Sequence, residues 1–114
     1  MTHYMKLNQK PFDLMSKGLK TIELRLNDEK RQNIKCGDII IFSSILKEEE
    51  KITVRVVKIH KFKSFEELYA CLPLEKCGYS SEELKNASPK DMLEYYPLEK
   101  QQSHGVLGIE ITRV

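Results

Sequence analysis

Two apolar stretches joined by a short charged segment place the strongest restriction on how this chain can fold. Residues 39–42 (IIIF) are apolar on both faces, which is typical of a strand in the middle of a sheet. Residues 51–62 (KITVRVVKIHKF) alternate, with the even positions from Ile52 to Val56 apolar and polar residues between them. The charged segment 47–50 (KEEE) is a loop tip. The pattern therefore predicts an antiparallel hairpin.

The residues before this hairpin predict a helix between two strands. A short strand over 4–7 is followed by a helix near 9–17, which Asn8 can cap. Gly18 is suited to end that helix in a left-handed conformation, and a strand over 21–26 follows at once.

The residues after the hairpin predict short helices and a last strand. Three helices are expected to begin at serine N-caps, which are Ser64, Ser80 and Ser88. We expect Pro97 to end the third helix. A final strand over 105–114 closes the chain, with Val106, Ile109 and Ile111 facing inward.

This order of elements predicts an α+β fold with a curved, mostly antiparallel sheet. Short strands with helices at the edges suit a small, partly open β-barrel. A length of 114 residues predicts a single domain over residues 1–114. No apolar run approaches the ~20 residues of a membrane span, and residues 1–10 lack the apolar stretch of a signal peptide. We therefore expect a cytoplasmic protein without a membrane segment.

The cysteines and histidines do not form a recognisable metal site. Cys36, Cys71 and Cys77 are odd in number and contain no C-x-x-C pair, so we expect buried or half-buried thiols without disulfides. The three histidines are scattered, and there is no glycine-rich phosphate loop. The sequence predicts no metal and no cofactor.

Charge is divided unevenly along the chain. Residues 1–63 contain 14 Lys and Arg against 8 Asp and Glu, whereas residues 64–114 contain 5 against 9. A basic face that attracts phosphates would explain this division, and so would a solvated surface with charges balanced across the fold.

The strand over 21–26 carries the most informative charged residues. Ile22, Leu24 and Leu26 form an apolar face that we expect to anchor the barrel. Glu23 and Arg25 are two residues apart, so they emerge on the other face roughly 6–7 Å from each other. Both an exposed ion pair and a binding cleft fit this pattern.

Lys20 is out of phase with these two charged residues. By strict alternation its side chain belongs on the apolar face, with Ile22. It can reach Glu23 only if the backbone between Gly18 and Thr21 is irregular, which a glycine helix cap permits.

The spacing G-x-K-x-x-E-x-R of Gly18, Lys20, Glu23 and Arg25 resembles the signature of the ASCH domain family, in the PUA-like superfamily. The resemblance extends over nearly the whole chain. It includes the pairs Pro11-Phe12, Lys30-Arg31, Gly37-Asp38, Ser64-Phe65, Tyr95-Tyr96 and Gly105-Val106. It implies a PUA-like β-barrel with flanking helices and a cleft, lined by the motif, for RNA or a nucleotide-like ligand.

In such a cleft each side chain has an expected role. Arg25 would form paired hydrogen bonds to a phosphate or base edge, and Lys20 would add a point charge. Glu23 would orient them or accept from a base amino group, with Thr21 as the nearest hydroxyl. Further candidates for ligand binding are Lys30, Arg31 and Lys35 as a basic rim, and Tyr96 as a ring on which a base stacks. Tyr95 and Tyr96 point about 100° apart on a helix, so we expect at most one to face the cleft.

The resemblance also suggests an enzymatic alternative. Some small ASCH proteins hydrolyse N-acetylated cytidine with a lysine, a threonine and a glutamate. The matching lysine here is Lys20, but Glu23 stands where those enzymes have threonine, and Glu75 is a candidate for the glutamate. A small amidohydrolase or ribonuclease that uses Lys20 and Glu23 as catalytic residues is therefore the alternative. A protein-interaction module is a third hypothesis, which would require a large exposed apolar patch.

Overall fold

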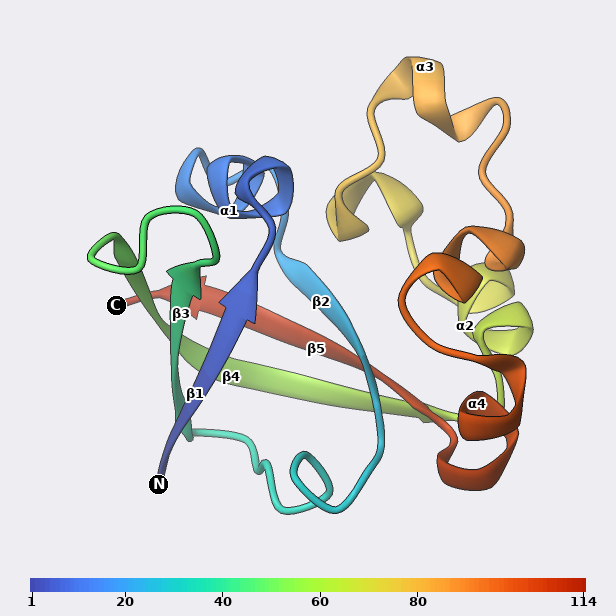
Figure 1. Cartoon of the computed structure of the whole chain (residues 1–114), viewed down its shortest axis with the longest axis horizontal. Helices are drawn as coiled ribbons and strands as arrows, with labels where there is room; N and C mark the ends of the chain where they lie inside the picture. The colour runs from blue at the N-terminus through green and yellow to red at the C-terminus, as the bar shows by residue number, and fades with distance from the viewer.

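A five-stranded sheet that curls into a half-barrel forms the centre of the molecule (Figure 1). The computed structural model describes residues 1–114. The strands are β1 (Thr2–Leu7), β2 (Ile22–Leu26), β3 (Ile39–Ser44), β4 (Lys51–Phe62) and β5 (Val106–Arg113), in the order β1-β3-β4-β5-β2. β1 pairs with β3 in parallel, and the other pairs are antiparallel. The prediction of an α+β fold with a partly open, mostly antiparallel barrel is confirmed.

Helices lie at two places around this sheet. The helix α1 (Gln9–Ser16) packs against the barrel near β3. A helical segment, residues 65–104, lies beside β2 and the far end of the β4–β5 ribbon (Figure 1). It contains α2 (Phe65–Cys71), the 3₁₀ helices η1 (Leu74–Cys77) and η2 (Pro89–Glu94), α3 (Ser81–Leu84) and α4 (Leu98–His104). None of these helices is both long and apolar enough to cross a membrane.

Most local predictions agree with the structure. β3 and β4 form the antiparallel hairpin, and β3 lies inside the sheet between β1 and β4. Gly18 follows α1 with a φ of 78°. The hydroxyl groups of the three N-cap serines accept hydrogen bonds from backbone N–H groups of their own helices, as expected.

The prediction for the segment after Ser88 is wrong in two respects. The helix there is a 3₁₀ helix that ends at Glu94, and Pro97 is the N-cap of the unpredicted helix α4. Only Gln101 of α4 is buried, so the sequence there has no apolar periodicity to reveal a helix.

Two separate apolar cores divide the molecule. The larger core fills the half-barrel and contains Phe42, Val54, Ile109 and Ile111. The smaller core lies between β2 and the helical segment. It consists of Ile22, Leu24, Leu26, Phe65, Leu68, Cys77, Met92 and Val106.

The prediction that the apolar face of β2 anchors the barrel is therefore wrong, because Ile22, Leu24 and Leu26 belong to the smaller core. Glu23 and Arg25 lie opposite Ile109 and Leu107 of β5, and side chains of directly paired residues share a face of the sheet. Those β5 residues belong to the barrel core, so the polar face of β2 points to the barrel side. The helices cover the other face, and Val106 likewise lies on this second side rather than beside Ile109.

Gly105, which joins α4 to β5, is the glycine whose replacement we expect to destabilise the fold most clearly. Its φ of 73° and ψ of −176° fall in a region that is essentially restricted to glycine, and an added Cβ would lie 3.0 Å from the Phe62 carbonyl oxygen. Gly105→Ala is expected to lower the free energy of unfolding by about 1–3 kcal/mol in urea denaturation. Gly18→Ala, with a φ of 78° but open space around the added carbon, is expected to lower it less. Equal losses for both variants would contradict this assignment.

Candidate functional site

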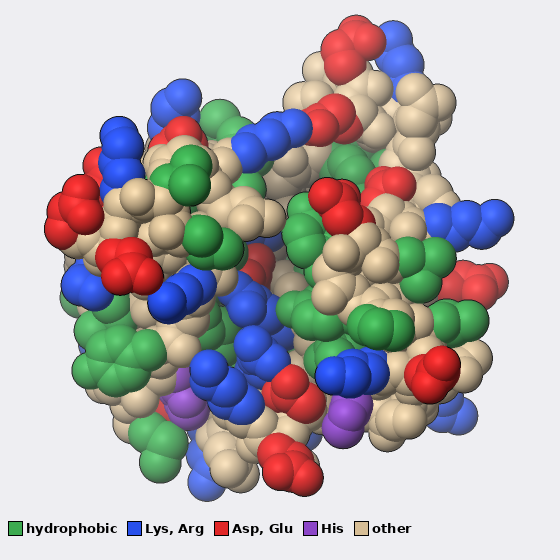
Figure 2. All heavy atoms as spheres, in the orientation of Figure 1, with side chains coloured by type: hydrophobic (Ala, Val, Ile, Leu, Met, Phe, Trp, Pro, Cys, Tyr) green, Lys and Arg blue, Asp and Glu red, His purple; other side chains and the backbone are tan.

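A cleft of about 500 Å³ separates the barrel from the helical segment (Figure 2). α1, β1 and β2 form its barrel wall, and η1, α3 and η2 form its helical wall. Its size is in the range of pockets that hold small ligands. The barrel wall contributes Glu23 and four cations, Lys6, Lys10, Lys20 and Arg25. The helical wall contributes the other three carboxylates, Glu83, Asp91 and Glu94.

Lys20 reaches the cleft because the chain between Gly18 and Ile22 is irregular. The backbone N–H groups of Leu19 and Lys20 both donate to the Leu14 carbonyl, which closes the end of α1. Regular β2 structure begins only at Ile22. The phase that alternation predicts for Lys20 is therefore lost, and its side chain turns to Glu23.

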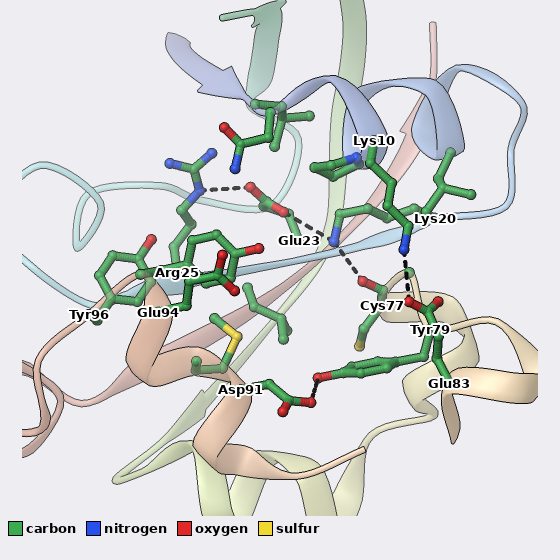
Figure 3. Close-up of a pocket in the computed structure, with 18 of the residues that line it drawn as sticks. Lys10, Lys20, Glu23, Arg25, Cys77, Tyr79, Glu83, Asp91, Glu94 and Tyr96 are labelled. Carbon is green, nitrogen blue, oxygen red and sulfur yellow. Dashed lines mark hydrogen bonds and ion pairs between the residues drawn. The ribbon is translucent and has the colours of Figure 1, made fainter. Parts of the chain in front are cut away.

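The ammonium group of Lys20 is enclosed by oxygen acceptors. Nζ donates to the carbonyl oxygens of Ile22 (2.9 Å) and Cys77 (2.8 Å) and lies 3.2 Å from Glu23 Oε1. Figure 3 shows the contacts with Cys77 and Glu23. The side chain is only 6% exposed. Two of the three N–H donors of the ammonium bond to these carbonyls, and its charge pairs with the Glu23 carboxylate. Lys20 therefore joins β2 to the helical segment, and most of its interactions are made inside the protein.

Glu23 is a buried carboxylate between two cations. Its Oε2 accepts a hydrogen bond of 2.7 Å from Arg25 Nε, while Oε1 faces Lys20. Burial acts to raise the pKa of Glu23, but the charges of Lys20 and Arg25 outweigh it and hold the pKa below the ordinary value of 4.5. Glu23 is thus ionised at neutral pH and is a weak base.

Arg25 closes the open side of the half-barrel. Besides Glu23, its guanidinium donates from Nη2 to the Lys6 carbonyl oxygen at 2.7 Å, which links β2 to β1 across the gap between the two edge strands. Burial lowers the pKa of Arg25, but Glu23 and Tyr96 outweigh this effect and raise it. These hydrogen bonds use two of the five N–H donors, so Arg25 still has donors for a ligand.

The helical wall carries a hydrogen-bonded chain of polar groups. The Tyr79 hydroxyl donates to Asp91 Oδ2 at 2.8 Å and lies 2.6 Å from the Tyr69 hydroxyl. Burial raises the pKa of Tyr69 to about 12 and also raises that of Tyr79. Both phenols therefore stay protonated and act as neutral hydrogen-bonding groups.

One ion pair spans the mouth of the cleft. Lys10 of α1 donates to Glu83 Oε2 of α3 at 2.7 Å (Figure 3). Both groups are well exposed, so the pair contributes little to stability and can open readily.

Tyr95 and Tyr96 both line the cleft, contrary to the expectation that only one would. Tyr96 is half-buried and stacks on Phe65, with ring centroids 6.2 Å apart and an interplanar angle of 14°. Tyr95 is 53% exposed. Tyr96 therefore has a packing role in the smaller core, while Tyr95 presents the more accessible ring.

The other predicted residues are divided between two places. Lys30 and Arg31 lie outside this cleft and line a second, smaller hollow that also contains Arg25. Thr21 and Lys35 line neither hollow. The backbone of Thr21 forms hydrogen bonds with the backbone of Lys76 and Ile111, so Thr21 has a structural role. Glu75 is exposed and also lies outside both hollows.

Sequence reasoning missed the helical wall. Asp91 and Tyr79 lie 53 or more positions beyond Leu26, the last residue of β2, and no local pattern connects them to this strand. The spacing of Ser80 and Glu83 predicts only a capping box, which the structure contains. Nothing in that motif signals that Glu83 also pairs with Lys10.

The cysteines provide neither a metal site nor a nucleophile at the cleft. No group of three or more His, Cys, Asp or Glu could hold a metal ion. Cys36 and Cys71 are exposed, so the expectation of buried or half-buried thiols is wrong for both. Cys77 is buried, and burial raises the pKa of its thiol to about 11, so it stays protonated at neutral pH.

Comparisons with known proteins agree with this architecture. The family model of the ASCH domain matches residues 5–114, and the chain belongs to this family. The crystal structure of the hypothetical protein PH0355 is similar over 100% of both chains, with 36% identity and a TM-score of 0.82. The solution structure of PF0455 from Pyrococcus furiosus is 35% identical, with a TM-score of 0.66, over 100% of this chain and 98% of that one. No curated protein matches this chain.

The charge of Glu23 should contribute to stability in a pH-dependent way. Because its pKa is lower in the folded state than the ordinary 4.5, this contribution is present above about pH 4.5 and is lost as the pH falls further. Glu23→Gln leaves two buried cations uncompensated, so we expect a loss of about 3–5 kcal/mol at pH 7. We also expect a shallower decline in stability below pH 4.5 than in the wild type. Urea denaturation across this pH range measures both effects.

A matched control is Glu94→Gln, which changes an exposed carboxylate in the same cleft that forms no ion pair. Its free energy of unfolding at pH 7 is expected to equal that of the wild type. A Glu23→Gln protein as stable as this control would show that the buried network does not hold the fold together.

Proposed function

We propose that this ASCH domain protein binds RNA or a nucleoside-containing ligand in the cleft between the barrel and the helical segment. The observation that carries the proposal is the arrangement of opposite charges on the two walls, with the partly buried Arg25 and the exposed Tyr95 between them. Cations lie on the barrel wall, and all but one of the carboxylates lie on the helical wall.

A nucleoside has features that match each part of this arrangement. Carboxylates and tyrosine hydroxyls such as Asp91 and Tyr79 can accept from or donate to base edges and ribose hydroxyls. The free donors of Arg25 suit a phosphate or a base carbonyl. The ring of Tyr95 offers a stacking surface. A wholly basic cleft would favour any polyanion, whereas mixed walls favour a ligand that has both donors and acceptors.

The contacts of Lys20 and Glu23 argue against hydrolysis. A catalytic lysine must reach the substrate, but Lys20 Nζ is buried, donates to two backbone carbonyl oxygens and faces Glu23. Glu23 has a lowered pKa and both oxygens in contact with cations, which makes it a poor base toward water. The structural role of this network is therefore the simpler account of both residues.

Tyr95 gives a test of the cleft that leaves the fold intact, because its ring is exposed. If a base stacks on it, Tyr95→Ala should weaken binding by about 1–3 kcal/mol, whereas Tyr95→Phe should bind as the wild type does. Calorimetric titration with ribonucleosides and ribonucleoside 5′-monophosphates, and fluorescence anisotropy with short single-stranded RNA, would measure this. Equal affinities for all three proteins would exclude stacking at Tyr95.

Arg25→Ala tests the charged part of the proposal. We expect this variant, checked for folding by circular dichroism, to bind nucleotides and RNA about tenfold or more weakly, with wild-type affinity falling as salt rises. Arg55→Ala is the matched control, since Arg55 is an exposed arginine of β4 outside the cleft. A wild-type protein that binds neither nucleotides nor RNA at low salt would refute the proposed function.

The hydrolase alternative predicts turnover of N-acetylated cytidine or RNA, which the contacts of Lys20 and Glu23 disfavour. We expect no deacetylation of N-acetylated cytidine and no cleavage of short RNA by the purified protein. Chromatography of the reaction products would detect either activity. Turnover that disappears in Lys20→Ala, checked for folding by circular dichroism, would establish catalysis instead.

A further inference from the structure

A second hollow beside the cleft differs from it in charge. This β1 groove, of about 380 Å³, is lined by five cations and no carboxylate. The cations are Lys6, Arg25, Lys30, Arg31 and Lys51. The main cleft, in contrast, includes four carboxylates, so the two hollows suit different chemical groups.

The sheet register fixes part of this groove. Ser43 of β3 is paired with Lys6 of β1 on one side and with Lys51 of β4 on the other. Side chains of directly paired residues share a face, so Lys6 and Lys51 project from the same face of adjoining strands. In the next row Tyr4 is paired with Ile41, and the Tyr4 ring is 66% exposed.

The loop after β2 supplies the other side of the groove. Arg31 is held by Asp28, and its Nε is a buried donor without a hydrogen-bond partner. Lys30 is exposed, and neither Lys30 nor Lys51 forms an ion pair. The groove therefore contains donors that no protein acceptor satisfies.

Carboxylates that neutralise some of these cations lie outside the groove lining. Lys6 pairs with Glu48 at 3.2 Å, where both side chains are more than 60% exposed. Such an exposed pair is weak, so a phosphate can replace Glu48 at little cost. Asp28 and Glu23 hold Arg31 and Arg25, respectively, in place.

The groove and the cleft adjoin, because Lys6 and Arg25 line both. Figure 2 shows Lys and Arg side chains gathered on this face beside the hollow between the barrel and the helical segment. A chain that extends from the cleft across Arg25 would reach a groove whose only charged residues are cations.

We propose that the β1 groove binds the backbone phosphates of a single-stranded RNA whose base occupies the cleft, an inference that rests on the proposed function. Phosphates in a row match a row of lysine and arginine donors. The exposed ring of Tyr4 adds a surface on which a neighbouring base can stack. The ligand is then a polynucleotide, because a free nucleoside would fill the cleft and leave the groove empty.

The test uses the double variant Lys30→Ala/Lys51→Ala, which removes two exposed side chains without disturbing an ion pair. Its matched control is Lys58→Ala/Lys61→Ala, which removes two exposed lysines of β4 outside both hollows. Fluorescence anisotropy would measure affinity for a short, labelled single-stranded RNA of randomised sequence over a range of salt concentrations. Calorimetric titration with unphosphorylated ribonucleosides would report on the cleft alone.

We expect the groove variant to bind RNA about tenfold more weakly at moderate salt. The slope of log affinity against log salt should become shallower by about 1.4, the value for two lost phosphate contacts on a single strand. Nucleoside binding should be unchanged in both variants, and the control should bind RNA as the wild type does. The proposal is overturned if the groove variant binds RNA like the wild type, or if both variants weaken it equally. If the wild-type protein binds nucleosides but no RNA, the proposal for the groove is refuted while the proposal for the cleft stands. If it binds neither, the proposed function itself is refuted.

Discussion

The buried network of Lys20, Glu23 and Arg25 is the interaction on which the arrangement of this molecule depends. Through Lys20 it reaches the Cys77 carbonyl in the helical segment, and through Arg25 it reaches the Lys6 carbonyl in β1. One carboxylate thus holds two cations that connect three parts of the chain. Removing Glu23 would leave two buried cations without compensation, which is the reason this network is costly to disrupt at its centre.

This network also explains how a half-barrel can remain open on one side. β1 and β2 are the two edge strands, and no backbone hydrogen bonds join them. Arg25 connects these edges with a side chain instead of a strand, which leaves room beside it for a cleft. The helices on the other face of β2 complete the burial of that short strand.

Lys20 and Arg25 differ in how much of their hydrogen-bonding capacity the protein itself uses. Lys20 is almost fully buried and donates to two carbonyl oxygens of the protein, whereas Arg25 uses only two of its five donors there. The cleft places opposite charges on facing walls, and the only charged residues that line the adjoining groove are cations. A ligand with a polar base and a phosphate chain complements both, which connects the two proposals to one face of the molecule.

Features that depend on neighbouring residues could be predicted from the sequence alone. Alternation from Ile52 to Val56 predicts β4, the serine N-caps mark three helix starts, and spacing puts Glu23 and Arg25 on one face. The core that the apolar face of β2 joins could not be predicted, because it depends on the curl of the sheet and the placement of residues 65–104. The tertiary structure decided this core, and it also decided that Lys20 meets Cys77 and that Arg25 meets Lys6, contacts between positions 57 and 19 residues apart. Such contacts leave no local pattern, since periodicity and capping report only on residues within a few positions of each other.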